Sequence, residues 1–104
     1  LGFAGLAVQA GVKSAVGSLW YVSDEGTLGL MTQLYEQLKQ APIKAEALRQ
    51  AQLAMLKGKV SVAGGQLVTD NKSVPLPPEL AQLTDRNFQH PYYWSAFTLI
   101  GSPW

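Results

Sequence analysis

The sequence contains no cysteine and only one histidine, His90. The absence of cysteine excludes disulfides, thiolate metal sites and a cysteine nucleophile supplied by these residues. One histidine also cannot build a multi-histidine metal site. We therefore expect no metal and no other cofactor. A chain without cysteine suits a reducing compartment, and we expect a cytoplasmic location.

Charge is also scarce. Charged residues make up 14% of the 104 residues and the net charge is +1, whereas charged residues usually account for about a quarter of a domain. The eight basic residues are scattered and form no basic stripe, so we expect no nucleic-acid partner. The apolar opening, residues 1–12, is too short to cross a bilayer, and we expect no membrane partner.

Helical spacing of apolar residues occurs three times. A short helix is predicted over residues 2–10. A second helix begins at Ser23 or Asp24, either of which can cap it, and ends near Gln40. Its predicted apolar face consists of Leu28, Met31, Leu34, Tyr35 and Leu38. A third helix is predicted from Pro42, in its first turn, to Gly58. Its predicted buried stripe consists of Ala47, Leu48, Ala51, Met55 and Leu56.

Two segments have the composition of strands. Residues 12–20 predict a buried strand, which we expect to be parallel because helices flank it. Residues 94–100 are rich in aromatic and β-branched residues and predict a second strand. Between the helices and this strand, residues 59–90 predict a long irregular loop or insertion that contains a small hairpin around Gly64 and Gly65 and a proline-rich stretch.

The predicted fold class is therefore α/β, a layered sheet with the order α-β-α-α-loop-β. Two strands do not make a stable sheet alone. We expect upstream strands or a second copy of the chain to complete it. The first residue is Leu1, within an apolar pattern, so we expect a fragment of a longer protein that forms a homo-oligomer when isolated.

Asp24 and Glu25 follow the first predicted strand after three intervening residues, Tyr21, Val22 and Ser23. Acidic residues suit the positive N-terminal end of a helix. Alternatively, a carboxylate at the carboxyl edge of a strand lies where open α/β sheets bind ligands, and it can hold a guanidinium or ammonium group. We interpret His90 as a structural hydrogen-bonding residue. The nearby aromatic residues form core and strand edge, or else line a peptide groove: Tyr92, Tyr93, Trp94 and Phe97.

Three stretches together resemble a known family. They are "AGVKSAVGSLWYVSDEGTLGLM" (10–31), "KAEALRQAQLAML" (44–56) and "HPYYWSAFTLIGSPW" (90–104). In this order they resemble the C-terminal half of CHAT domains, caspase-like domains often fused to tetratricopeptide repeats, especially in cyanobacteria. The resemblance covers nearly the whole chain, residues 1–104, as part of one such domain.

The resemblance implies a caspase-type fold and a cysteine peptidase with a His-Cys dyad. In the family, both dyad residues precede the segment that corresponds to Leu1, and His90 does not match the dyad histidine. The resemblance thus implies a part similar to a caspase small subunit, which is inactive alone. Its expected partners are the upstream half of the same domain, tetratricopeptide repeats and a peptide or protein substrate.

The stretch "GSLWYVSD" is also similar to the separase segment Leu-Trp-Asp-Val-Thr-Asp, in which an acidic residue helps to hold a basic side chain before the cut bond. Asp24 matches the second Asp of that segment, whereas Tyr21 replaces the first. By this resemblance Val22, Ser23, Asp24 and Glu25 shape the substrate pocket. The alternative is a non-catalytic interaction or signalling module of a protein with tetratricopeptide repeats.

Overall fold

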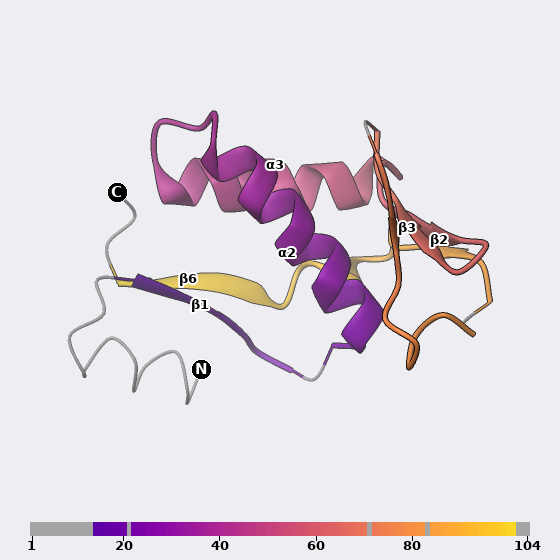
Figure 1. The fold of residues 1–104 in the computed structure, drawn as a ribbon. Coiled ribbons are helices and arrows are strands. Elements are labelled where there is room, and N and C mark those ends of the chain that lie inside the picture. Colours follow the sequence, from indigo (N-terminus) through magenta and orange to yellow (C-terminus); the bar gives the residue numbers. More distant parts are fainter. Residues whose placement is uncertain (1–13, 21, 71, 83, 102–104) are drawn as a thin grey trace.

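The computed structural model describes residues 14–20, 22–70, 72–82 and 84–101 (Figure 1). The described elements follow the order β1 (Ser14–Ser18), α2 (Asp24–Leu38), α3 (Lys44–Leu56), β2 (Ser61–Ala63), β3 (Gln66–Val68), β4 (Ser73–Pro75), β5 (Arg86–Asn87), the 3₁₀ helix η1 (Pro91–Tyr93) and β6 (Phe97–Gly101). This mixture of helices and sheets confirms the α/β class. The helix predicted over residues 2–10 lies outside the described residues.

β1 and β6 form a two-stranded antiparallel sheet, in which Val16 lies opposite Leu99. The prediction of a parallel strand is therefore wrong for this pair. In a parallel pair, one helix carries the chain from the end of the first strand back beside its start, so both strands run in the same direction. Here α2 and α3 run in opposite senses, so the chain comes back to the end of β1 and enters β6 in the opposite direction (Figure 1). β6 also begins later than predicted, at Phe97, because residues 94–96 form a turn after η1.

The segment 59–90 forms a second antiparallel sheet with the strand order β4-β3-β2-β5. Its β2–β3 hairpin turns at Gly64 and Gly65, with φ of 59° and 73°, as the sequence predicted. Positive φ at both positions is the geometry that favours glycine in tight hairpins. The rest of this segment is less irregular than predicted. Pro75 lies in β4, an edge strand, where a missing N–H is tolerated.

α3 buries most of the predicted stripe, but Leu56 is 44% exposed, and Pro42 precedes the N-cap residue Ile43. α2 buries a different face from the predicted one: Glu25, Gly26, Gly29, Leu30, Gln33 and Leu34. Tyr35 and Leu38 are exposed instead. The glycines explain the difference, because they allow close packing that the apolar spacing does not reveal. A Cβ on Gly29 would lie 3.1 Å from Val60 Cγ1.

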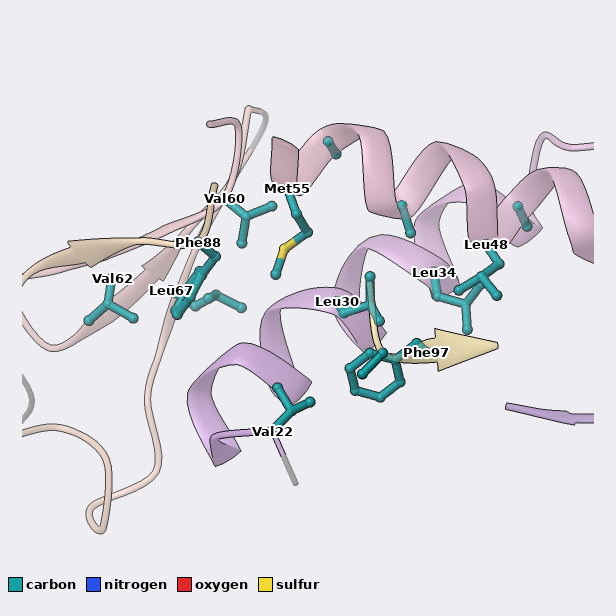
Figure 2. Packing of buried hydrophobic residues seen from close by; sticks show 14 of the residues in the cluster. Val22, Leu30, Leu34, Leu48, Met55, Val60, Val62, Leu67, Phe88 and Phe97 are labelled. Atoms are coloured by element: carbon teal, nitrogen blue, oxygen red, sulfur yellow. The ribbon is translucent and has the colours of Figure 1, made fainter. Parts of the chain in front are cut away.

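One hydrophobic core joins the two sheets through the helices (Figure 2). Phe88, Met55 and Leu67 gather between the helices and the second sheet, whereas Val22, Leu30 and Phe97 gather beneath α2, towards β6 (Figure 2). Burying each such side chain contributes about 1.5–3 kcal/mol. The α2–α3 hairpin is thus fixed on both sides, and the first turn of α2 is held at the end of β1.

Gln52 of α3 fixes the start of β6. Its Nε2 donates to the Trp94 carbonyl at 2.7 Å and to the Phe97 carbonyl at 3.1 Å. The Leu19 N–H then donates to the Ala96 carbonyl at 2.9 Å, which extends the β1–β6 pairing by one step. These bonds determine where the chain leaves β1.

Candidate functional site

The candidate site is the segment that joins β1 to α2. The Ser23 hydroxyl accepts a hydrogen bond from the Gly26 N–H at 3.2 Å and is the N-cap of α2. Asp24 and Glu25 occupy the first turn, where the helix dipole favours negative charge. Val22 is buried in the core. The four residues predicted for the pocket are thus adjacent, but their side chains lie in different surroundings.

Glu25 is buried and paired. Its Oε1 accepts a hydrogen bond from Arg86 Nη1 at 2.9 Å, and its side chain is only 9% exposed. The Arg86 side chain is 32% exposed, and its Nη2 lies 3.5 Å from Thr84 Oγ1. A carboxylate buried this far needs a cation. Arg86 of β5 supplies it and links the second sheet to the first turn of α2.

Asp24 has the opposite surroundings. It is exposed, and it makes no ion pair with any described residue. Of the two acidic residues, Asp24 alone therefore presents a carboxylate that an incoming group can reach without displacing Arg86. A carboxylate in this position can form charge-assisted hydrogen bonds with a guanidinium or an ammonium group.

Exposed aromatic and apolar side chains border the same segment. The rings of Trp20 and Tyr92 are stacked with centroids 6.4 Å apart, and Trp20 Nε1 donates to the Tyr92 carbonyl at 3.2 Å. Trp20, Tyr92 and Leu19 are 42%, 43% and 58% exposed. Aromatic faces attract cationic groups. The end of β1 therefore combines an open carboxylate with aromatic surface.

η1 holds the aromatic residues in place. His90 is its N-cap, and its Nδ1 accepts a hydrogen bond from the Tyr92 N–H at 3.1 Å. This agrees with the structural role expected of His90. Tyr93 packs on the first turn of α2, since a Cβ on Gly26 would lie 2.9 Å from Tyr93 Cδ1. Phe97 is buried, whereas Trp94 is only half-buried.

The sequence indicated neither of two contacts at the site, the Arg86–Glu25 pair and the packing of Tyr93 on Gly26. Arg86 is 61 residues from Glu25 along the chain, and no local pattern links them. Tyr93 reaches Gly26 only because the helix has no side chain there. A buried glutamate requires a cation, but the sequence did not show that Glu25 would be buried.

No three His, Cys, Asp or Glu residues in the described part of the chain lie close enough to hold a metal ion. None of the helices described is both long enough and apolar enough to cross a membrane.

Comparison with known proteins gives the family. The family model described as "CHAT domain" matches residues 1–102. The search of curated proteins and the search of solved structures each found no match to this chain. The matched range covers almost the entire chain, including the segment from β1 to α2 and the η1–β6 segment. The chain belongs to the CHAT domain family.

Proposed function

We propose that the chain is the small-subunit-like part of a caspase-like CHAT cysteine peptidase, and that it supplies sheet strands and one wall of the substrate pocket. In this proposal the upstream half of the same domain carries the His-Cys dyad. The histidine accepts the thiol proton, and the cysteine thiolate attacks the peptide carbonyl carbon. The C–N bond then breaks as the histidine returns the proton to the leaving amine, and water hydrolyses the thioester to release the acid and the free thiol. Tetratricopeptide repeats are the proposed neighbouring module.

The observation that carries the proposal is the contrast between Asp24 and Glu25. Glu25 is neutralised by Arg86 at 2.9 Å, whereas Asp24 is exposed. Asp24 is the first residue of α2 and lies four residues after Trp20, whose ring is half-exposed. This arrangement supports recognition of a basic side chain before the cut bond. Val22 and Ser23 contribute by fixing the turn that carries Asp24.

The experiment is a cleavage assay on the full-length protein. Fluorogenic peptides carry Arg, Lys, Asp or Leu before the scissile bond, and the variant is Asp24→Ala. The control is Glu79→Ala, which removes another exposed carboxylate from a loop. Losing a hydrogen bond between charged groups corresponds to a fall in kcat/KM of about 10- to 100-fold. We expect this fall for Arg and Lys peptides in Asp24→Ala only.

If Asp24→Ala cleaves the Arg and Lys peptides as fast as the unaltered protein, Asp24 does not bind the substrate. Its role is then limited to the N-terminus of α2. Cleavage of none of the four peptides would favour the alternative function, a non-catalytic interaction module. The exposed side chains of Tyr35 and Leu38 on α2 favour this second function, because they offer an apolar surface for a protein partner. The upstream reading frame also discriminates between the two, since a peptidase requires a histidine and a cysteine after two predicted strands.

A further inference from the structure

A polar groove lies between α2, α3 and the turn from β3 to β4. It has two adjoining lobes of about 100 and 160 Å³. Both lobes are lined by Gln33, Gln37 and Asp70, and Gln50 and Gln40 add further carboxamides, one to each lobe. This groove is separate from the candidate site, because Gln33 is about 14 Å along the helix axis from Asp24 at 1.5 Å per residue.

Gln33 is the unusual residue of the groove. It is only 9% exposed, yet its side chain makes no hydrogen bond with any described residue. No side-chain nitrogen or oxygen in the described part of the chain is both fully buried and unpaired. The Gln33 amide group therefore reaches the groove that its residue lines. Because the amide is accessible from the groove, water can satisfy it in the free chain, and a polar group that enters the groove can take the place of this water.

Gln37 lies one turn further along α2 and lines the same two lobes. Side chains four residues apart on a helix have Cβ atoms about 6 Å apart. Alternate residues of an extended chain are about 6.8 Å apart, and each presents one N–H and one C=O on the same side. A carboxamide offers one donor group and one acceptor group, so two carboxamides at this spacing match two alternate residues of an extended strand.

We propose that this groove binds an extended segment of polypeptide, whose main chain is hydrogen-bonded by the Gln33 and Gln37 side chains. The charged rim sets the preferred side chain. Lys57 lines the groove and makes no ion pair with the described residues, whereas Lys59 is paired with Asp70 at 3.5 Å. Lys57 therefore selects an acidic residue in the bound segment.

Asp70, which lies after β3, borders one side of the groove. Its carboxylate is joined to Lys59 at 3.5 Å, and the nearby Lys72 Nζ lies 2.9 Å from Glu36 Oε1 on α2. Asp70 and Lys72 are thus linked to α2 and to the segment after α3. The proposed site is consequently formed before the segment binds, which reduces the entropic cost of binding.

The test is an NMR titration of the ¹⁵N-labelled chain with a capped pentapeptide, acetyl-Ala-Ala-Glu-Ala-Ala-amide. Three matched peptides replace Glu by Gln, replace Glu by Lys, or carry N-methyl groups on the central peptide nitrogens. The side-chain NH₂ signals of Gln33 and Gln37 report contact directly. Main-chain recognition tolerates most sequences, so this alanine-based probe is adequate.

The variant Gln33→Met keeps the volume of the side chain and removes its hydrogen-bonding groups. The control variant is Gln82→Met, at an exposed position outside the groove. We expect Gln33→Met to weaken binding of the Glu peptide about three- to tenfold, the range for one neutral hydrogen bond. Gln82→Met has no effect. Lys57→Met removes the preference for the Glu peptide over the Gln peptide.

Shifts at Gln33 and Gln37 that the N-methylated peptide fails to produce support the proposal. Two results overturn it: no shift at millimolar peptide, or equal shifts with the N-methylated peptide. The amide spectrum of Gln33→Met shows whether this variant is folded. If the variant is unfolded, the comparison of the four peptides on the unaltered chain still tests the proposal. The outcome is independent of any cleavage activity.

Discussion

Arg86 and Glu25 form a largely buried ion pair, with Nη1 and Oε1 2.9 Å apart. The pair joins β5 of the second sheet to the first turn of α2. It also separates the functions of two adjacent carboxylates, because Glu25 is neutralised within the fold while Asp24 remains exposed. The second sheet is therefore part of the structure that supports the candidate site.

Arg86→Gln should destabilise the fold. Removing one partner of a buried pair costs about 3–5 kcal/mol, and water partly compensates here because the Arg86 side chain is about a third exposed. We expect a loss of about 2 kcal/mol in the free energy of unfolding, measured by urea denaturation. The double variant Glu25→Gln/Arg86→Gln should recover at least half of this loss. A double variant as unstable as the single one would show that Glu25 does not need its cation.

Gly26→Ala should also destabilise the fold, although alanine normally favours a helix by about 1 kcal/mol. The new Cβ would lie 2.9 Å from Tyr93 Cδ1 and 3.0 Å from Ser23 Oγ. We expect a net loss of about 1–2 kcal/mol by overpacking. The same substitution in a Tyr93→Leu background should become neutral or stabilising. Stabilisation by Gly26→Ala with Tyr93 present would contradict the packing of η1 on α2.

Gln52→Met should loosen β6 at its start. The variant leaves the carbonyls of Trp94 and Phe97 without the donor that lies 2.7 and 3.1 Å away. We expect a loss of about 2 kcal/mol for two hydrogen bonds and faster hydrogen exchange at the Leu19 amide. Gln50→Met is the matched control, since Gln50 bonds only to Glu46 on the same helix. Equal effects of the two substitutions would argue against this role for Gln52.

The turn from β3 to β4 should respond to pH through Glu36. The hydrogen bond from Lys72, followed by the charge of Lys39, holds the pKa of Glu36 below its usual value. A carboxylate with a lowered pKa stabilises the folded state above its ordinary pKa, and this contribution disappears as the pH falls through the lowered value. The NMR signal of the Lys72 side chain should therefore shift as Glu36 becomes protonated. Glu36→Gln should show the low-pH positions already at neutral pH.

Glu46 provides a control for this pH titration. Glu46 also has a pKa below its usual value, because of Gln50 and Arg49 on α3. Glu46→Gln should leave the pH response of Lys72 unchanged. A response that persists in Glu36→Gln would assign it to another group.

The predictable part of the fold was local. Apolar periodicity and the Ser23 cap predicted both helices, and two adjacent glycines predicted the β2–β3 hairpin. The buried face of α2 was not predictable from apolar spacing, because Gly26 and Gly29 pack against Tyr93 and Val60. The direction of β6 and the strand β5 depend on pairing between residues far apart in the chain, which short-range patterns do not encode. β4 pairs with the neighbouring strand β3, but Pro75 and the prolines after it are typical of a loop.

The site was predictable to a similar extent. The position of the acidic pair after β1 follows from the sequence, and its place at the start of a helix is confirmed. The different environments of Asp24 and Glu25 were not predictable, because they depend on Arg86, which is distant along the chain. The burial of Gln33 was not predictable either, because it depends on which face of α2 packs against the core.

The most direct measurement is an NMR titration of the ¹⁵N-labelled chain with acetyl-Ala-Ala-Arg-amide and with its citrulline analogue, which has the same shape but no charge. We predict shifts at the Asp24 amide and the Trp20 indole N–H with the Arg peptide only. These shifts should be lost in Asp24→Asn. Equal shifts with the citrulline peptide, or an unchanged response in Asp24→Asn, would contradict the claim that Asp24 receives a basic side chain.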